Sequence, residues 1–497
     1  MNWQHILKKF WAKKSHKSTL RITAVEYGAN QQDSAKQNTI KSTRGTEGAT
    51  PRKAKIKACL TQFADIPDGA RKVRVIIGID FGTAFTKVVI EVKEYKYGVP
   101  LNDTKQGTEK YLLPTRMYQD ASGNLTVTEP KNLASSHTEY TDLKMRILDN
   151  TLDKETRNRI ITYIAWVLQK SRGWLMNEKQ AVFGATRLKW EVNVGLPTEK
   201  YEDEELRKTY RELVGEAWYM STDPQLRGES DGKSNNTERK LHPDHIEAFP
   251  EFVAQIQSYI SSPQRKRGIH TLVDVGAGTI DATVFIVHQE KGENIHPILA
   301  ASVESLGTIY LANHRCSSLM PSSDWTPSSQ DLFPSLDEFT EKLGVTLEQI
   351  NVVDKGFRKR VIDQINSRLK HAKPKAPIQT DWETGVPLML CGGGARVEFY
   401  KEVVSILIRP EYGYLLQKSR LSVRDKLDAP GLLEEDSDRL SVAYGLSFDA
   451  LQIGEITHPG PIPFETENTG QGKSCPKCSG TGGGYSNCPE CGGSGFR

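Results

Sequence analysis

Several features that would assign this chain to a common class are missing. Only 37% of its 497 residues are hydrophobic, the mean hydropathy is −0.52, and no apolar run reaches the roughly 18 residues of a membrane-spanning helix. The first residues include lysines but no apolar stretch of about 7 to 15 residues before a cleavage site, so no secretory signal is expected. Neither a GxxxxGKS/T motif nor a strand-linked GxGxxG is present, so P-loop and Rossmann nucleotide sites are not supported.

Cysteine is scarce through most of the chain. Three of the seven cysteines are scattered (Cys59, Cys316 and Cys391), and the other four lie within the last 23 residues. Such clustering is typical of a metal site rather than of a disulfide scaffold. A reducing, cytoplasmic location is therefore expected.

Acidic residues are rare at the start of the chain. The first 58 residues contain 13 Lys and Arg against 3 Asp and Glu, a net charge of +10 that leaves −6 for the remainder. Residues 1–70 are therefore expected to form a basic, largely disordered tail. Its apolar residues between Trp3 and Trp11 recur at helical spacing, which predicts a short amphipathic helix. This helix either lies on an anionic membrane, docks into a partner, or belongs to a merely solvated tail.

Ordered structure is expected to begin at Val73. The stretch VRVIIGID (Val73–Asp80) is rich in β-branched residues, and a short turn separates it from a second apolar strand, FTKVVIEV (Phe85–Val92). The same strand, turn and strand recur in TLVDVGAGTIDATVFIV (Thr271–Val287). Helical patterns fill the intervening segments. The chain is thus predicted to be an α/β protein with two similar halves.

Both turns have the composition of a phosphate-binding loop. Glycine lets the backbone approach a phosphate, successive N–H groups can point at its oxygens, and a threonine hydroxyl adds a donor. An aspartate at the strand end can hold a divalent ion through its waters. The two turns supply Asp80, Gly82 and Thr83, and Asp274, Gly276, Gly278, Thr279 and Asp281. One Asp-Gly turn is also a common structural hairpin, but two in one chain favour a phosphate site.

These motifs resemble the ATPase superfamily that includes actin, the DnaK-type heat-shock chaperones, hexokinase and the plasmid-segregation protein ParM. The segment PLMLCGGGARVEFYKEVV (Pro387–Val404) is similar to the adenosine-binding strand, turn and helix of that superfamily. The resemblance implies a two-lobed α/β fold of duplicated ribonuclease-H-like halves. It also implies that Gly392, Gly393 and Arg396 contact the adenine.

The resemblance also divides the chain. The segment DRLSVAYGLSF is similar to a late connecting helix of the superfamily, with Ala443 and Gly445 at a helix crossing. The expected units are a first ATPase lobe (71–268), a second lobe (269–437), the connecting helix that returns to the first lobe (438–453), a linker (454–473) and a zinc knuckle (474–497).

Roles in ATP hydrolysis follow from the same resemblance. Asp80 and Asp274 are the candidates for organising Mg²⁺ and its waters. The phosphate-facing lysine is either Lys87, at the actin-type spacing from Asp80, or Lys144, in YTDLKMRIL, which resembles a DnaK segment. Either lysine can also be an ordinary surface residue.

Two further candidates depend on the resemblance. Glu251 matches a ParM-like Pro-Glu helix start and would orient the attacking water, although an acidic residue in a first helical turn also simply complements the helix dipole. Phe249 replaces the glutamate of the DnaK-type Glu-Pro order. Gly307, in ESLGTIYLAN, matches a loop that meets phosphate in DnaK-type proteins.

The C-terminal segment CPKCSGTGGGYSNCPECGGSG contains two Cys-x-x-Cys pairs. Four thiolates at this spacing can close a tetrahedral shell around Zn²⁺: Cys475, Cys478, Cys488 and Cys491. A redox role fits less well because no thioredoxin-like helix is expected nearby. Each pair resembles the repeat of the DnaJ-type zinc region, which implies contact with a protein client or partner.

The sequence therefore predicts a DnaK-like, nucleotide-switched ATPase that uses ATP and Mg²⁺ to control a protein partner or client. The alternatives are an actin- or ParM-like filament-forming ATPase and a nucleotide-binding pseudo-ATPase that acts as an assembly scaffold. The basic tail predicts an anionic membrane or another anionic partner, while nucleic acid is not expected to bind the folded body. The expected location is the cytoplasm, free or peripheral at a membrane.

Overall fold

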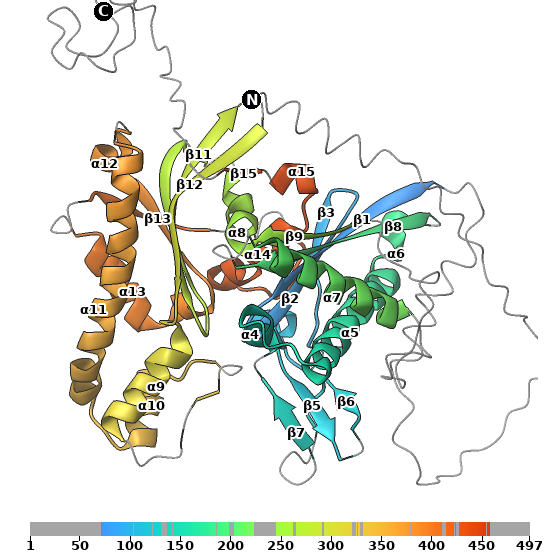
Figure 1. Ribbon diagram of the computed structural model, residues 1–497, viewed down its shortest axis with the longest axis horizontal. Helices are drawn as coiled ribbons and strands as arrows, with labels where there is room; N and C mark the ends of the chain where they lie inside the picture. Colours follow the sequence, from blue (N-terminus) through green and yellow to red (C-terminus); the bar gives the residue numbers. More distant parts are fainter. Residues whose placement is uncertain are drawn as a thin grey trace, which may run out of the picture.

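The computed structural model places two α/β halves side by side (Figure 1). The structure describes residues 71–457, except for residues 103, 122, 131–136, 142, 185, 198–202, 223–244, 262–264, 291–292, 321–324, 326, 329–331, 378, 410–413, 422, 424–426 and 454. Within these residues, no helix is both long and apolar enough to cross a membrane. The basic tail, nearly all of the predicted linker and the cysteine cluster lie outside the described residues.

The first half is built on a mixed sheet around β1 (Lys72–Phe81). β2 (Phe85–Val92) and β3 (Tyr95–Gly98) continue from β1 as an antiparallel meander. On its other side β1 pairs in parallel with β8 (Arg187–Leu196), which pairs in parallel with β9 (His245–Pro250). β1 is buried almost throughout, as expected for a central strand of a sheet that is covered on both faces.

Helices cover the two faces of this sheet. α5 (Lys154–Glu178) and α7 (Glu204–Thr222) pack against one face, where alternate apolar side chains of β1 join them in one core. α14 (Ser441–Leu446) packs on the other face, against β1 and β2. Gly78 of β1 makes this contact possible, because a Cβ at this position would overlap with the backbone of α14.

The second half repeats this plan. β10 (Gly268–Val275), β11 (Ile280–Glu290) and β12 (Glu293–Glu304) form the antiparallel meander. β13 (Val386–Cys391) and β14 (Leu416–Ser419) add to β10 in parallel. Strand order and directions are those of the first half, so the two similar halves and the α/β class predicted from the sequence are confirmed.

The second sheet is also covered on both faces. α11 (Leu347–Ala372) and α13 (Glu398–Leu407) pack on one face. α8 (Glu251–Ile260) packs on the other, where Phe252, Val253 and Ile256 join side chains of β10, β11 and β13. α8 follows the first sheet in the chain, yet its apolar side chains pack against the second sheet.

α8 and α14 cross each other between the two sheets. Gly445 of α14 faces the backbone of Ala254 in α8, and a Cβ on Gly445 would lie 2.7 Å from Ala254 Cα. The helix crossing predicted at Gly445 is therefore confirmed. These two helices form the apolar connection between the halves.

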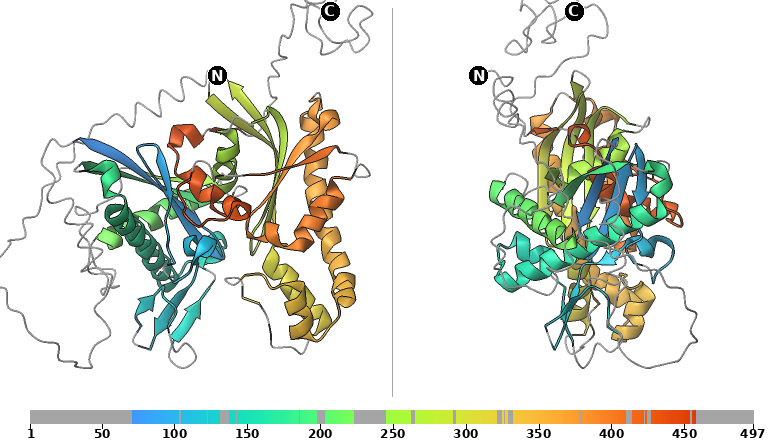
Figure 2. Two further views of the ribbon diagram at one scale, coloured as in Figure 1. Left: turned by 180° about the vertical axis from the view of Figure 1, so that it is seen from behind. Right: turned by 90° about the vertical axis from the view of Figure 1, so that its right-hand side faces the viewer.

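Smaller elements extend from each half. The three-stranded sheet of β5, β6 and β7 extends from the first half, and α9 with α10 from the second, at the same end of the molecule (Figure 2). Standard capping sets the helix ends here, with Ser335 accepting from Glu338 N at the start of α10 and left-handed Gly344 at its end. The remaining bounds are β4 (Leu113–Pro114), β5 (Met117–Asp120), β6 (Leu125–Thr126), β7 (His137–Tyr140), β15 (Glu455–Thr457), α4 (Leu143–Leu148), α6 (Gln180–Phe183), α9 (Thr308–Leu319), α10 (Leu336–Leu343), α12 (Asp381–Thr384), α15 (Ala450–Ile453) and the 3₁₀ helices η1 (Gly107–Tyr111), η5 (Lys373–Lys375), η6 (Gly393–Arg396) and η9 (Glu434–Leu440).

Candidate functional site

A cavity of about 720 Å³ lies between the two halves. The turns of both repeated hairpins line it and lie next to each other, since a Cβ on Gly278 would be 3.9 Å from Thr83 Cγ2. Of the site residues predicted from the sequence, fourteen line this cavity: Asp80, Gly82, Thr83, Lys87, Lys144, Glu251, Asp274, Gly276, Gly278, Thr279, Asp281, Gly392, Gly393 and Arg396. Residues far apart in the sequence thus meet in one cleft.

Glycine has a different role in each of the two hairpin turns. A Cβ on Gly82 would lie 2.5 Å from Phe85 O, so the first turn is too tight for a side chain. In the second turn, Gly276 N donates to Thr279 O at 2.9 Å. A Cβ on Gly276 would come no closer than 3.5 Å to any neighbouring atom of the protein. A methyl group on Gly276 would therefore make only ordinary van der Waals contact with Thr279, on a turn whose backbone lines the cavity.

Two lysine–carboxylate pairs border the turns. Lys87 pairs with Asp80 across β1 and β2, with Nζ 2.8 Å from Oδ2. Lys144 of α4 pairs with Glu251, with Nζ 2.6 Å from Oε1. Burial disfavours the charged form of Lys144, but the nearby carboxylates, above all Glu251, outweigh this and hold its pKa above the usual value. Lys144 therefore stays charged beside the cleft at neutral pH.

Two half-buried aspartates of the second hairpin, Asp274 and Asp281, have no lysine or arginine ion pair among the described residues. Asp274 and Asp281 are paired across β10 and β11. Burial, and after it the neighbouring carboxylates, raise the pKa of Asp274 to about 7 and that of Asp281 to about 8. Gln255 Nε2 donates to Asp274 Oδ2 at 2.9 Å, while Asp281 Oδ1 is buried without a hydrogen-bond partner among the described residues.

The acid cluster can hold a cation, though not by direct ligation in its present geometry. Among the described residues, no three Asp, Glu, His or Cys side chains lie close enough to hold a metal ion. The unpartnered oxygen of Asp281 and the raised pKa values of both aspartates nevertheless indicate that the protein alone provides little stabilisation of their ionised forms, which a bound cation would supply. These residues fit a hydrated divalent cation.

Gly307 lies behind the second turn rather than in the lining of the cavity. Its N–H donates to Gly278 O at 3.2 Å, and the next two amides, of Thr308 and Ile309, donate to Gly276 O at 3.1 Å and Ala277 O at 2.9 Å. The start of α9 thereby holds the turn from behind. Thr308 itself reaches the cavity.

The loop after β13 fits closely under the second hairpin. Gly392 has a φ of 83°, and a Cβ there would overlap with Asp274 and lie 2.6 Å from Val275 O. A Cβ on Gly394 would similarly overlap with Val275. Only glycine therefore allows this loop to pass so close to the strand end that carries Asp274.

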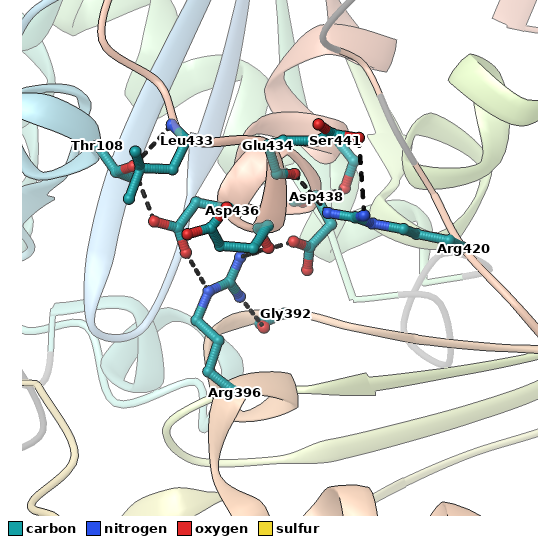
Figure 3. A network of polar contacts seen from close by, with 10 residues as sticks. Thr108, Gly392, Arg396, Arg420, Leu433, Glu434, Asp436, Asp438 and Ser441 are labelled. Atoms are coloured by element: carbon teal, nitrogen blue, oxygen red, sulfur yellow. Dashed lines mark hydrogen bonds and ion pairs between the residues drawn. The ribbon is translucent and has the colours of Figure 1, made fainter.

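Arg396 is held by several acceptors of the protein itself. Its guanidinium forms ion pairs with Asp436 and Asp438 and donates to Gly392 O at 3.1 Å and to Glu435 O at 2.8 Å (Figure 3). All three of its nitrogens thus have acceptors within the protein. The base contact that the resemblance implied stays a prediction, and the guanidinium is held by other partners in this structure.

Sequence reasoning did not single out several residues that line the cavity. Gln255 follows Glu251 by four residues in α8, so helical spacing alone could have indicated it. Arg439 and Arg315 also reach the cavity, as does the segment 332–337. No local motif marks these residues, because the fold alone brings them to the cleft.

Comparison with known proteins gives a distant structural likeness only. No protein-family model matches the chain, and no curated protein matches it. Among solved structures, the chain is similar to MreB5 of Spiroplasma citri bound to AMPPNP, with 12% sequence identity and a TM-score of 0.43 over 76% of this chain and 95% of that one. The same protein bound to ADP gives 12% identity and a TM-score of 0.42 over 75% and 94%. These similarities are too low to assign a function, which must be inferred from the cleft itself.

Proposed function

We propose that this protein binds ATP with Mg²⁺ in the cleft between its halves and hydrolyses it, as an actin-like ATPase. The observation that carries the proposal is the pair of like-built glycine turns, one from each half, that meet across a single cavity. Turns of this kind can direct backbone N–H groups at phosphate oxygens from two sides.

The charges around the turns suit a metal–triphosphate. Lys87 and Lys144 place two ammonium groups near the turns, and Asp80 and Asp274 end the central strands of the two sheets. Mg²⁺ would neutralise charge on the phosphates and would be held through its waters by the aspartates. Magnesium keeps several waters in most sites, which agrees with carboxylates too far apart for direct ligation.

Glu251 is the proposed base for hydrolysis. It occupies the first turn of α8, borders the cavity and holds Lys144 at 2.6 Å. In this position its carboxylate would orient a water for attack on the terminal phosphorus and accept the proton as the P–O bond to the leaving phosphate breaks. Lys144 would then stabilise negative charge on the transferred group.

The actin-like assignment is preferred over the DnaK-like one because of two residues. Lys87 occupies the actin-type position and contacts Asp80, and Glu251 occupies the ParM-type position and borders the cleft. A DnaK-like switch that controls a protein client is the second candidate, supported by the position of Lys144. Binding of an anionic partner by residues 1–70, zinc binding by the four cysteines and a cytoplasmic location remain proposals from the sequence.

Nucleotide binding tests the proposal directly. ATP and ADP affinities are measured with and without Mg²⁺ for the full chain and for Gly276→Ala, whose methyl group fits the protein but occupies space beside the turn. We expect Gly276→Ala to weaken ATP binding by about tenfold or more, or about 1.4 kcal/mol. Gly356→Ala, an exposed glycine of α11 with no atom within 4 Å of the added Cβ, is the matched control and should bind as wild type. Equal ATP affinity in both variants would refute the site.

Hydrolysis and assembly separate the candidate functions. Glu251→Gln should lower phosphate release by about 100-fold with ATP affinity little changed. Sedimentation that depends on ATP would support the actin-like assignment, and a monomer at all protein concentrations would favour the DnaK-like switch. Tight ATP binding by wild type without turnover would indicate the pseudo-ATPase scaffold instead.

A further inference from the structure

Arg396 connects the nucleotide loop of the second half to a segment that comes later in the chain. It ends η6, directly after the glycine loop that passes under Asp274. Its partners Asp436 and Asp438 belong to η9, which leads into α14 (Figure 3). The guanidinium contacts both carboxylates, with Nη2 2.7 Å from Asp438 Oδ1.

Helix η9 is attached to the first half. Thr108 of η1 donates its hydroxyl to Asp436 Oδ2 at 2.8 Å and accepts from Leu433 N at 3.3 Å. Leu432 and Leu440 share an apolar cluster with Val89 of β2. The ion pairs of Arg396 therefore join the second half to a segment packed on the first.

The ion pairs of Arg396 are partly buried and differ in this from an ordinary surface ion pair. Arg396 is 28% exposed, and the Asp436 and Asp438 side chains are 15% and 12% exposed. Burial raises the pKa of Asp436, but the hydrogen bonds from Arg396 and Thr108 outweigh this and place it below the usual value. A planar guanidinium that meets two carboxylates and two backbone carbonyls has its orientation fixed.

This contact borders the proposed ligand. Gly393, Arg396, Asp438 and Arg439 all line the cavity, and Arg396 Nη1 donates to the carbonyl of Gly392. A ligand in this cavity would contact residues of both halves, so separation of the halves would weaken its hold. Separation would pull the second-half guanidinium away from carboxylates that remain with the first half.

We infer that Arg396 is a positioning residue: its contacts with Asp436 and Asp438 clasp the two halves together and limit the rate at which nucleotide leaves the cleft. This inference rests on the proposed nucleotide site for its consequence, although the clasp itself exists without ligand. In this inference, Arg396 holds the two halves close together and does not bind the adenine.

Hydrogen exchange in the ligand-free protein tests the clasp. Amides of residues 434–446 should exchange faster in Arg396→Ala and in Asp436→Asn than in wild type. Arg396→Lys should be intermediate, because lysine keeps the positive charge but lacks the planar guanidinium that reaches both carboxylates. Arg420→Ala is the control: Arg420 donates to Glu434 O at 2.6 Å on the same segment, but its side chain is 56% exposed and lies outside the cavity lining. Exchange in Arg396→Ala no faster than in Arg420→Ala would overturn the clasp.

Dissociation rates test the consequence. A fluorescent ATP analogue should leave Arg396→Ala about tenfold faster than wild type, with association changed less than about twofold. The double variant Arg396→Ala/Asp436→Asn should show no further increase, because the first change already removes the contact. An unchanged dissociation rate would overturn the inference.

Inorganic tripolyphosphate separates a clasp from a base contact. It lacks a base, so loss of a clasp should weaken its binding as much as that of ATP, whereas loss of a stacking contact should weaken ATP alone. Weakening of ATP alone would therefore overturn the inference. If wild type binds neither ligand, the proposed function fails, and hydrogen exchange in the ligand-free protein still decides whether the clasp exists.

Discussion

Replacing Gly445 by alanine tests the packing of α14 against α8. This glycine lies where α14 crosses α8, against the backbone of Ala254. A Cβ on Gly445 would lie 2.7 Å from Ala254 Cα and closer to the carbonyl of the same residue, whereas carbon atoms in contact are about 3.5 to 4.0 Å apart. Because backbone cannot rotate aside, one helix must shift by about 1 Å.

The cost follows from that shift. Overpacking a close-packed interior costs about 1 to 3 kcal/mol, and the upper end applies because the obstacle is backbone. Alanine is favoured over glycine inside a helix by about 1 kcal/mol, which offsets part of this. Gly445→Ala should therefore lower the free energy of unfolding by about 2 kcal/mol. Gly356→Ala, also in a helix but with open space around the added Cβ, should raise it by up to about 1 kcal/mol.

Urea unfolding of both variants measures the difference. Midpoints and slopes are compared with wild type by tryptophan fluorescence, and a change in midpoint at constant slope reports stability. ATP affinity is measured in parallel, because α8 carries Glu251 and Gln255 into the cleft. A Gly445→Ala variant as stable as Gly356→Ala would refute the close approach of the two helices.

Raising the pH should destabilise the ligand-free protein. Asp274 and Asp281, with pKa values of about 7 and about 8, keep protons in the native state that the unfolded chain releases near its ordinary pKa. The free energy of unfolding should fall by a few kcal/mol, at up to about 1.4 kcal/mol per pH unit for each group, as the pH rises from about 4 to about 8. Urea unfolding across this range measures the profile; Asp281→Asn should flatten it, and an equally steep profile in that variant would contradict the assignment. A second prediction concerns Asp354, which binds the buried Arg315 at 2.9 and 2.7 Å: Asp354→Asn should cost about 3 to 5 kcal/mol in thermal unfolding because it leaves a buried guanidinium without its counter-charge, and a loss below about 1 kcal/mol would show that the pair is not buried in solution. Finally, elemental analysis should find one zinc per wild-type chain and none in Cys478→Ser, and metal-free wild type would disprove the predicted knuckle.

Local sequence signals were sufficient for the parts of the site formed by neighbouring residues. Each hairpin has two apolar strands joined by a short glycine turn, so strand propensity and turn chemistry point to the same structure. The internal repeat then predicted that the turns following Asp80 and Asp274 play equivalent parts, and they meet in one cleft. The helix crossing at Gly445 was predicted from the resemblance of DRLSVAYGLSF to a connecting helix, and α14 does cross α8 there.

Contacts between distant segments could not be predicted in this way. Lys144 and Glu251 are 107 residues apart, and no local pattern indicates that they pair. Arg396 shows the limit most clearly: its motif predicts an adenine contact, but in the structure tertiary packing provides two carboxylates that hold its guanidinium. A motif identifies which residues line the cleft, while the charges packed around them determine which partners they bind.

The order of helices along the chain makes the two halves depend on each other. α8 follows the first sheet but covers the second, and α14 follows the second sheet but covers the first. Neither sheet can therefore bury both of its faces without a helix from beyond its own segment of chain. Glu251, at the start of α8, directly follows β9 and lies against Gly195 of β8, so its pair with Lys144 of α4 stays within the first half. Separation of the halves would thus break the ion pairs of Arg396 while the pair of Lys144 with Glu251 stays intact, so under the proposed function we expect the spacing of the halves to act on nucleotide release rather than on the proposed base.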